Sequence, residues 1–373
     1  MIRYQPFEYL LEMNRILFLK QLDWIIGTLT TGALPKARRS TILLAHIKNI
    51  LVIRPGGIGD AVLSIPAIIA LKKRFPQTAI DILAEKRNSA IFTFCPNVSK
   101  ILHYDKPSEL FAAIRGDYDV VIDSEQWHRL SAVVARLTRA PMSIGYATNE
   151  RKKLFTHPIP YSHDDYEINS FFNLIAPLTG PLSVDLDRPF LTVPAESMIK
   201  IRSLLQPLAK RSIVALFPGG SIAERRWGSA RFHQVAQALE EHGYGVVVIG
   251  GREDRQAGEE ISESLPGVIS FCGQLSLVET AALLTEAALL ITGDSGILHI
   301  GFGLGIKTLS LFGPGIEIKW APRGPHHVVI NKHLACSPCT KFGYTPKCKI
   351  DAACMKQITA DEVCDKAITL LEG

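Results

Sequence analysis

The sequence predicts an α/β protein with two similar parallel-sheet domains that face an interdomain cleft. From Asn49 onward, short apolar runs alternate with helix-like segments, and the alternation restarts after a Pro- and Leu-rich stretch over residues 177–194. The first strand of each half ends in a glycine turn. Because ligands of open parallel sheets bind at the carboxyl ends of the strands, the two turns predict a binding site in the cleft.

The individual strands are predicted from short apolar runs, and the segments between them suit helices. In the first half the strands lie at residues 50–53, 80–83, 101–104 and 120–122, with helices over 67–75 and 127–137. In the second half the strands lie at residues 213–217, 246–249, 268–271, 289–292 and 308–312.

Length, composition and net charge limit the kinds of protein that this sequence can encode. With 373 residues the chain is too long for one ordinary core, and its hydrophobic fraction of 47% supports well-buried cores. No apolar run is long enough to cross a bilayer and no secretory signal follows Met1, so a cytoplasmic protein is expected. The net charge of +5 favours anionic partners, but nucleic acid is discounted because no nucleic-acid-binding motif accompanies it.

Residues 1–46 precede the first strand as an N-terminal helical extension. Apolar residues between Leu10 and Ile25 recur at helical spacing, which predicts an amphipathic helix. One interpretation is interfacial attachment to a membrane, aided by Arg38 and Arg39. The other interpretation, favoured because the polar face is not strongly basic, is packing on the chain's own body or on a neighbouring subunit.

The segment NILVIRPGGIGDAVLSIP, which begins at Asn49, joins a buried-strand pattern to a glycine turn and a helix start. Gly56 and Gly57 let the backbone approach a ligand closely, and Asp60 is placed at the carboxyl end of the strand. Asp60 is therefore a candidate functional carboxylate. The alternative is that it only caps the helix.

The second half repeats this design in the sequence FPGGS, which is followed by the basic loop ERRW. Two guanidiniums, on Arg225 and Arg226, over a glycine turn would clamp a diphosphate, although a solvated basic loop has the same composition. Glu253 follows the next strand, where a carboxylate either accepts hydrogen bonds from ribose or begins a helix.

The segment TGDSGILH carries the strongest pattern of the second half, because a strand runs into a helix at Asp294, Ser295, Gly296 and His299. Backbone N–H groups and a serine hydroxyl at such a helix start form a phosphate cradle. Alternatively, Asp294 is only a cap and His299 only a hydrogen-bonded helix residue. The sequence contains neither a G-x-S-x-G elbow nor a P-loop, and its glycine turns fall short of G-x-G-x-x-G.

Taken together, GGIGDAVLSIPAI, FPGGS with ERRW, and GDSGILH followed by GIKTLSLFGP resemble the bacterial heptosyltransferases of glycosyltransferase family nine. The resemblance runs from about Asn49 to the C-terminus. It implies two Rossmann-like domains in the GT-B arrangement and an enzyme that transfers heptose, with inversion, from ADP-heptose to the lipopolysaccharide core. It further implies a glycolipid acceptor, no cofactor required for catalysis, and a cytoplasmic location in which peripheral contact with the inner membrane stays open.

The resemblance also implies roles for single residues. Asp60 matches the catalytic base that takes a proton from the acceptor hydroxyl, and Arg225 matches a basic residue that stabilises the leaving diphosphate. Inverting transfer needs one base and positive charge beside the diphosphate, which agrees with these roles. Lysine is common in the family where Arg225 stands, and a larger residue where Gly293 stands, so the identity of the donor stays open. The donor-binding residues are Gly56, Gly57, Gly219, Gly220, Ser221, Glu253, Asp294, Ser295, Gly296 and His299.

Four cysteines follow the spacing C-x2-C-x8-C-x5-C, at Cys336, Cys339, Cys348 and Cys354. Four soft ligands in one loop are typical of a structural zinc or iron site, and reduced thiols or a regulatory disulfide are the alternatives. Similar segments occur in part of the family that the chain resembles, in protein-modifying heptosyltransferases that bind iron and form large oligomers. A protein acceptor and a homo-oligomer are therefore considered as well.

The predicted boundaries are 1–46 for the extension, 47–190 for an acceptor domain, 191–354 for a nucleotide-sugar domain with the cysteine-rich loop 336–354, and 355–373 for a C-terminal helix. A return of this helix to the N-terminal domain is considered. Two other functions are weighed: transfer from another nucleotide sugar, and a non-enzymatic oligomeric scaffold with a metal knuckle and a degenerate cleft. Asp60 together with Arg225 and Asp294 argues against the scaffold.

Overall fold

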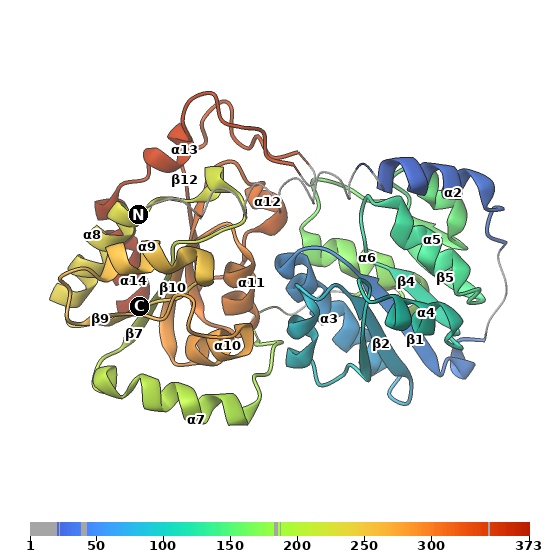
Figure 1. Ribbon diagram of the computed structural model, residues 1–373, viewed down its shortest axis with the longest axis horizontal. Helices are drawn as coiled ribbons and strands as arrows, with labels where there is room; N and C mark the ends of the chain where they lie inside the picture. Colours follow the sequence, from blue (N-terminus) through green and yellow to red (C-terminus); the bar gives the residue numbers. More distant parts are fainter. Residues whose placement is uncertain (1–20, 22, 39–42, 183–185, 187, 342–343) are drawn as a thin grey trace. The chain divides into compact units, whose positions relative to one another are not determined.

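Two six-stranded parallel sheets form the framework of the chain (Figure 1). The computed structural model describes residues 21, 23–38, 43–182, 186, 188–341 and 344–373. It divides into two compact units. The first contains Met1–Gly56, Pro66–His163 and Ile168–Leu182, and the second contains Gly57–Ile65, Asp164–Glu167 and Ser183–Gly373.

The first sheet has the strand order β3-β2-β1-β4-β5-β6, and all of its neighbouring strands run parallel. Its central strand β1 is buried from Ile50 to Arg54, and its register pairs Ile53 with Leu83 on one side and with Asp123 on the other. The strands are β1 (Asn49–Arg54), β2 (Ala79–Ala84), β3 (Lys100–His103), β4 (Val120–Asp123), β5 (Met142–Tyr146) and β6 (His157–Ile159).

Helices connect these strands, as parallel pairing requires. The helices α4 and α5 pack over β3, β4 and β5, and their apolar residues join Leu51, Ile53 and Val121 in one core. The helical elements of this part of the chain are α3 (Ile58–Arg74), η3 (Ser89–Phe94), α4 (Pro107–Arg115), α5 (Arg129–Leu137), η4 (Glu150–Leu154) and α6 (Glu167–Thr179).

The second sheet repeats the arrangement of the first, with the order β12-β11-β10-β7-β8-β9 and parallel pairing throughout. In both sheets the first strand of the half lies beside the fourth, so the strand order reverses between β1 and β4 and between β7 and β10. This is the Rossmann strand order, and ligands bind at such reversal points. The strands are β7 (Ile213–Phe217), β8 (Gly245–Val248), β9 (Val268–Ser270), β10 (Ala287–Gly293), β11 (Lys307–Phe312) and β12 (His327–Asn331).

Helices cover both faces of the second sheet. On one face, α8 and α9 pack against β8, and α9 also packs against β9. The helices α10 and α11 pack against β10. The helical elements are α7 (Ala195–Leu204), η5 (Gln206–Leu208), η6 (Ala223–Arg225), α8 (Ser229–Glu241), η7 (Arg252–Asp254), α9 (Arg255–Ser262), α10 (Leu277–Thr285), α11 (Gly296–Gly303), α12 (Glu317–Trp320), α13 (Ala353–Lys356) and α14 (Ala360–Glu372).

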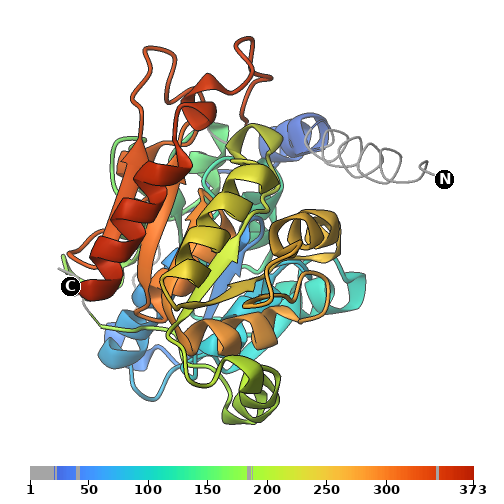
Figure 2. The same cartoon turned by 90° about the vertical axis from the view of Figure 1, so that its left-hand side faces the viewer.

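The C-terminal helix α14 belongs to the second unit. It lies beside α8 and against β10 and β11 (Figure 2). Val363 and Ala367 are fully buried in the core of this unit, and the Lys307 Nζ donates a hydrogen bond of 2.7 Å to the Leu370 carbonyl. The return of this helix to the N-terminal domain, considered above, is therefore wrong, because its apolar face is already buried on the second sheet.

The predicted amphipathic helix of the extension lies largely outside the described residues. The described part contains the π-helical turn η1 (Asp23–Gly27) and α2 (Thr28–Ala33), both packed on α5, and η2 (Leu44–His46). The Asp23 carboxylate accepts hydrogen bonds from the N–H groups of Arg129, at 3.1 Å, and Leu130, at 2.9 Å. No helix in the described part of the chain is long and apolar enough to span a bilayer.

Candidate functional site

The predicted phosphate cradle lies where β10 passes into α11, at the reversal point of the second sheet. Ser295 is the N-cap of α11, and its Oγ accepts a hydrogen bond of 3.3 Å from the Leu298 N–H. Thr292 at the end of β10 reaches the same Oγ at 3.2 Å. The start of α11 at Gly296 therefore presents the positive end of the helix dipole at the strand edge, where an anion is stabilised.

Arg225 and Asp294 form an ion pair in this site. The Arg225 Nη1 lies 2.7 Å from the Asp294 Oδ2, and the Asp294 side chain is 5% exposed. Burial raises the pKa of Asp294, and the charge of Arg225 opposes this rise. A Cβ at Gly293 would come within 2.9 Å of the Arg225 carbonyl oxygen. Glycine at position 293 therefore allows the loop that carries Arg225 to pack directly on β10.

His299 lies one turn into α11 and is 3% exposed. Burial, with a contribution from the Arg225 charge, lowers its pKa to about 4, so the imidazole is neutral at physiological pH. Its Nδ1 is buried, and no described residue provides it with a hydrogen-bond partner.

The turn that carries Asp60 belongs to the second unit together with α11. A Cβ at Gly59 would lie 2.6 Å from the His299 Cδ2, and a Cβ at Gly296 would lie 2.8 Å from the Ile58 Cγ2. Glycine at these two positions therefore lets the starts of α3 and α11 meet. Asp60 follows Gly59 as a half-buried residue of the first turn of α3, so the structure brings the predicted base and the predicted phosphate cradle into one neighbourhood.

The second glycine turn, Pro218 to Ser221, follows β7 at the same reversal point. A Cβ at Gly219 would lie 2.5 Å from the Asp254 Oδ1, so this carboxylate lies directly against the turn. The Asp254 Oδ2 also accepts a 2.9 Å hydrogen bond from the Gly251 N–H, and burial raises its pKa. The Arg226 Nε donates to the Gly220 carbonyl at 2.8 Å.

Two of the predicted donor-binding residues have exposed side chains. Glu253 is exposed, and its carboxylate lies over Gly251, where a Cβ would be 2.4 Å away. Ser221 is also exposed. Sequence reasoning selected Glu253 and missed the neighbouring Asp254, which is the buried carboxylate at the end of this strand. Both acids follow the glycine pair closely, after Arg252, and only burial distinguishes them.

A second group of charges lies at the reversal point of the first sheet, and sequence reasoning missed it. The Arg54 side chain is 1% exposed at the end of β1, and its Nη2 lies 3.0 Å from the Glu125 Oε2 just beyond β4. Arg54 also donates to the Ser124 carbonyl at 2.7 Å. Burial would raise the pKa of Glu125, but the charges of Arg54, His128 and Arg151 together outweigh it and the pKa is lowered. One feature of the sequence could have indicated this pair, because Arg54 is a charged residue at the end of an apolar strand.

This buried pair supports the glycine turn ahead of Asp60. A Cβ at Gly56 would lie 3.3 Å from the Arg54 Nη2, and Gly56 has a left-handed φ of 104° that favours glycine. Gly57 is exposed, and a Cβ there would meet no atom within 4 Å.

The four clustered cysteines line one small cavity of about 20 Å³, together with Glu224. All four are free thiols in this structure. Burial and the neighbouring cysteines raise the pKa values of Cys339 and Cys354. Among the described residues, no three Cys, His, Asp or Glu side chains are arranged to hold a metal ion, so the structure gathers the predicted ligands without forming a coordination shell.

Comparisons with known proteins agree with this architecture. The profile of glycosyltransferase family 9 (heptosyltransferase) matches residues 108–349, which is more than half of the chain. Lipopolysaccharide heptosyltransferase 3 of Escherichia coli is 27% identical over 289 residues, which cover 71% of this chain and 83% of that protein.

Two solved structures show the same fold. The ADP-heptose lps heptosyltransferase II of E. coli superimposes with a TM-score of 0.73 at 22% identity, covering 87% of this chain and 98% of its own. The dodecameric iron-containing heptosyltransferase TibC, in complex with ADP-D-beta-D-heptose, gives a TM-score of 0.59 at 14% identity and covers 89% and 78%. The predicted GT-B class with two Rossmann-like parallel-sheet domains is confirmed. With the family profile extending over most of the chain, the chain belongs to glycosyltransferase family 9, the heptosyltransferase family, and is a glycosyltransferase.

Proposed function

We propose that this glycosyltransferase moves heptose, with inversion, from ADP-heptose to a lipopolysaccharide core acceptor. The observation that carries the proposal is the single neighbourhood formed by the turn of Asp60, the start of α11 and the Arg225–Asp294 ion pair. It supplies a carboxylate, a guanidinium and a helix N-terminus, which are the groups that transfer from a sugar diphosphate needs. The named heptosyltransferase relatives supply the sugar, the nucleotide and the acceptor class.

In the proposed reaction Asp60 is the general base. Its carboxylate takes the proton of the acceptor hydroxyl, and the acceptor oxygen forms a bond to the anomeric carbon of the heptose. The bond between that carbon and the diphosphate oxygen breaks, and ADP leaves with the electron pair. No second catalytic carboxylate is needed, because inversion takes place in one displacement.

In the same proposal, Arg225 and the start of α11 stabilise the charge that develops on the departing diphosphate. Asp294 fixes the guanidinium through the 2.7 Å ion pair, so that less side-chain freedom is lost when the donor binds. The neutral His299 adds a hydrogen-bonding group beside this anion without a second positive charge.

The glycine turn after β7 is proposed to receive the rest of the donor. Gly219 and Gly220 have no side chains. Asp254 and Arg226 hold the turn in place through the contacts described above. Glu253 is exposed at the end of β8 and is proposed to accept hydrogen bonds from the ribose.

The test is a donor panel with purified full-length protein and a heptose-deficient lipopolysaccharide core as acceptor. ADP-heptose, GDP-mannose and UDP-glucose are supplied separately, and the release of nucleoside diphosphate and the mass of the acceptor are followed. The proposal expects release of ADP with a heptose added to the lipid. Turnover with GDP- or UDP-sugar alone would contradict the donor, and ADP release with heptose recovered on a protein would contradict the acceptor.

The cysteine cavity is proposed to hold a structural zinc or iron ion. What supports this is the donor set: four thiols around one cavity, which suits soft metals. The ion would stabilise the loop that carries Thr340, whose hydroxyl is 3.4 Å from the Arg225 Nη2, and it would take no part in the transfer. The TibC structure, which is iron-containing by name, is a reason to measure iron as well as zinc.

A further inference from the structure

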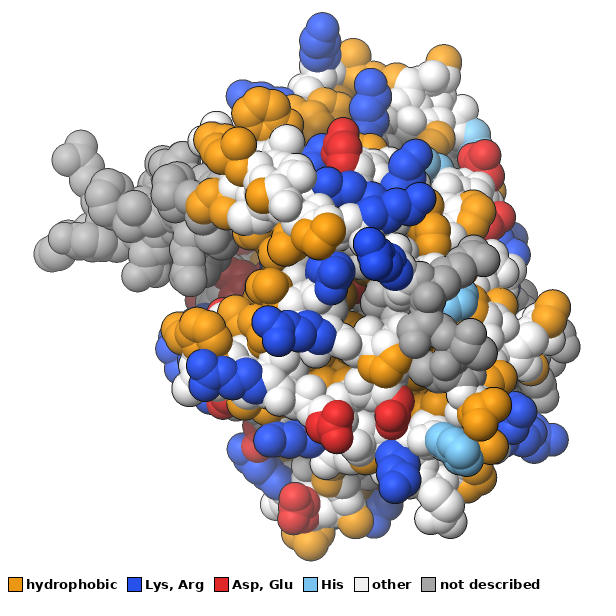
Figure 3. All heavy atoms as spheres, turned by 90° about the vertical axis from the view of Figure 1, so that its right-hand side faces the viewer, with side chains coloured by type: hydrophobic (Ala, Val, Ile, Leu, Met, Phe, Trp, Pro, Cys, Tyr) orange, Lys and Arg blue, Asp and Glu red, His pale blue; other side chains and the backbone are white. Residues whose placement is uncertain are grey.

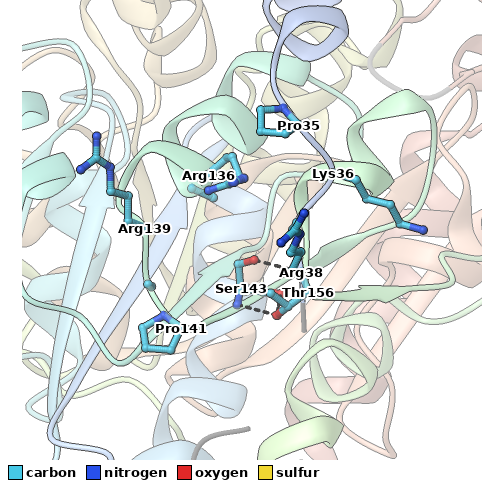
Figure 4. A pocket seen from close by; sticks show the side chains of 11 residues that line it. Pro35, Lys36, Arg38, Arg136, Arg139, Pro141, Ser143 and Thr156 are labelled. Carbon is cyan, nitrogen blue, oxygen red and sulfur yellow. Dashed lines mark hydrogen bonds between the residues drawn. The ribbon is translucent and has the colours of Figure 1, made fainter. Parts of the chain in front are cut away.

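A cavity of about 430 Å³ lies in the first unit, away from the site described above (Figure 4). Its walls come from the chain segment that follows α2, from the end of α5 and from the residues that begin β5 and β6. In a parallel sheet these are the amino ends of the strands, whereas Arg54 and Glu125 lie at the carboxyl ends. The cavity is therefore separate from the edge of the sheet where α/β enzymes bind their substrates.

The lining of the cavity is strongly basic. Lys36, Arg38, Arg136 and Arg139 line it, and none of the described residues that line it is acidic. No described residue forms an ion pair with any of these four side chains. Like charges gathered in this way repel each other, so the arrangement lowers the stability of the empty chain and favours binding of an anion.

The individual groups show where an anion would bind. Arg136 extends from α5, and its Nε is buried without a hydrogen-bond partner among the described residues. Figure 4 shows Arg136 and Arg38 standing over the Ser143–Thr156 pair, with Lys36 and Arg139 extending from either side. Ser143 and Thr156 hold each other through backbone and side-chain hydrogen bonds of 2.8 to 3.0 Å and so form a fixed floor.

Two guanidiniums and a buried N–H donor without a partner match the geometry and charge of a phosphate group. A carboxylate would accept fewer of these hydrogen bonds. The volume is enough for a phosphate with its ester substituent, so the cavity is not restricted to an inorganic ion.

The surface around the cavity indicates the source of the phosphate. Leu137, between two of the lining arginines, is 42% exposed. Leu29 is 69% exposed on α2, which packs on α5 and leads into Lys36. Figure 3 shows lysine and arginine side chains interspersed with hydrophobic ones on one face of the first unit. Exposed apolar side chains beside basic ones are typical of surfaces that bind anionic bilayers.

We propose that this cavity, lined by Lys36, Arg38, Arg136 and Arg139, binds the phosphate of an anionic phospholipid headgroup and so fixes the first unit on a membrane surface. The exposed apolar side chains of Leu29 and Leu137 enter the interfacial region of the bilayer next to it. The inference concerns binding alone, so it stands or falls independently of the sugar donor and the acceptor.

The experiment measures binding of the full-length protein to phosphatidylcholine vesicles with and without phosphatidylglycerol, by cosedimentation at fixed ionic strength. The test variant is Arg38→Gln with Arg136→Gln. The control variant is Lys73→Gln with Arg115→Gln, which removes two exposed charges of the same unit that do not line the cavity. Thermal unfolding of each variant verifies that it is folded.

We expect wild-type protein to bind the anionic vesicles and not the neutral ones, and the test variant to bind about 30-fold more weakly, at about 1 kcal/mol for each charge. The control should stay within about twofold of wild type. Equal losses in both variants would mean that net charge alone drives binding and would overturn the proposal.

A second arm distinguishes lipid from soluble phosphate. Inorganic phosphate and glycerol 1-phosphate are titrated against the protein by calorimetry and as competitors of vesicle binding. Weak binding of these ions, with slight competition, agrees with a headgroup held within a bilayer. Tight binding of either ion with no binding to anionic vesicles would show that the cavity serves a soluble phosphate ester, and would contradict the lipid proposal.

Discussion

His299 illustrates how a single residue links the site to stability. Its imidazole is 3% exposed on α11, packs against the start of α3 at Gly59, and is held neutral by burial and by the Arg225 charge. A protonated His299 would place a second cation beside Arg225 in a buried environment, which is costly. In the proposed reaction, this arrangement leaves one positive charge, that of Arg225, beside the diphosphate.

The stability of the chain should depend on pH through this residue. The pKa of His299 is about 4 in the folded chain and about 6.5 in the unfolded chain, so the unfolded state binds a proton first as the pH falls. Stability from this residue is complete above pH 6.5 and is lost as the pH falls toward 4, by about 2 kcal/mol between pH 7 and pH 5. Thermal midpoints measured across this range should fall less in His299→Gln than in wild type. Parallel curves for the two proteins would show that His299 is not buried as described.

The Arg225–Asp294 pair makes a second prediction at this scale. Arg225→Ala leaves Asp294 buried without its partner and should lower the free energy of unfolding by about 3 kcal/mol and weaken ADP binding. The double variant with Asp294→Ala should recover part of the stability but none of the ADP affinity, because the cation proposed to bind the diphosphate is still absent. Denaturant unfolding and ADP calorimetry on the two singles and the double measure both effects. Additive losses in the double variant would contradict the coupling.

The sequence could predict candidate site residues where their role follows from their position just after a strand. Arg225 was predicted in one phosphate-binding loop, and Asp294 and Ser295 in another. The structure places Ser295 as the N-cap of α11 and joins Arg225 and Asp294 in an ion pair. Asp254 and Glu125 were not predicted. A carboxylate that ends a strand looks the same in a sequence whether it is exposed or buried, and only the packed neighbours decide which one it is.

At the scale of elements, η1 and α5 depend on each other. His128, the residue before α5, makes no side-chain cap bond, and Asp23 supplies the missing acceptor from far away in the sequence. Burial would raise the pKa of Asp23, but hydrogen bonds from His128, Leu130 and Arg129 outweigh it and the pKa is lowered. The described part of the extension thus acts as a cap for a helix of the first unit.

Removal of this cap should loosen both elements. Asp23→Ala should lower the free energy of unfolding by about 1 to 2 kcal/mol, because two helix N–H groups lose their acceptor. Asp23→Asn is the graded comparison. Asparagine keeps only one of the two acceptor oxygens, and its amide nitrogen cannot accept the second N–H, so this variant should retain only part of the stability. Hydrogen exchange of the Arg129 and Leu130 amides reports the effect locally. Unchanged protection of these amides in Asp23→Ala would contradict the capping role.

The cysteine loop gives a further prediction at this scale. If the four thiols hold a metal ion, Cys339→Ser should lower the bound metal and the thermal midpoint together. The control is Cys272→Ser, which removes a buried thiol outside the cavity and should leave the metal content unchanged. Elemental analysis of both proteins, purified without chelators, measures this. A wild-type protein free of zinc and iron would remove the proposed ion.

Most strands were recognisable from the sequence, and the exceptions share a cause. The strands β5, β6 and β12 were not predicted, because none of them has the continuous apolar run of a central strand. The strands β6 and β12 lie at sheet edges, and β5, although buried, contains Ser143 and Gly145. β6 is the short segment His157–Ile159 with a proline, and β12 begins at a histidine. Such segments lack the apolar run that marks a central strand, and their pairing is decided by the neighbouring strand.

At the scale of the whole molecule, the two halves repeat one design. Each sheet has its first and fourth strands side by side, and each carries charged or phosphate-binding residues just beyond those two strands. This repetition was predictable because the same strand, glycine turn and helix pattern occurs twice. The assignment of the first turns of α3 to the second unit was not predictable, because it depends on the close approach of Gly59 to His299.

The measurement that tests the central claim most directly is heptose transfer from ADP-heptose to the lipopolysaccharide core by wild type, Asp60→Asn and Asp365→Asn, with ADP affinity measured on the same preparations. Asp365 is an exposed carboxylate of α14 and controls for the change itself. The account predicts that Asp60→Asn loses transfer by about a thousandfold, within the usual contribution of a general base, and retains ADP binding. Asp365→Asn should match wild type. Transfer by Asp60→Asn at a rate near that of wild type would contradict the assignment of Asp60 as the base.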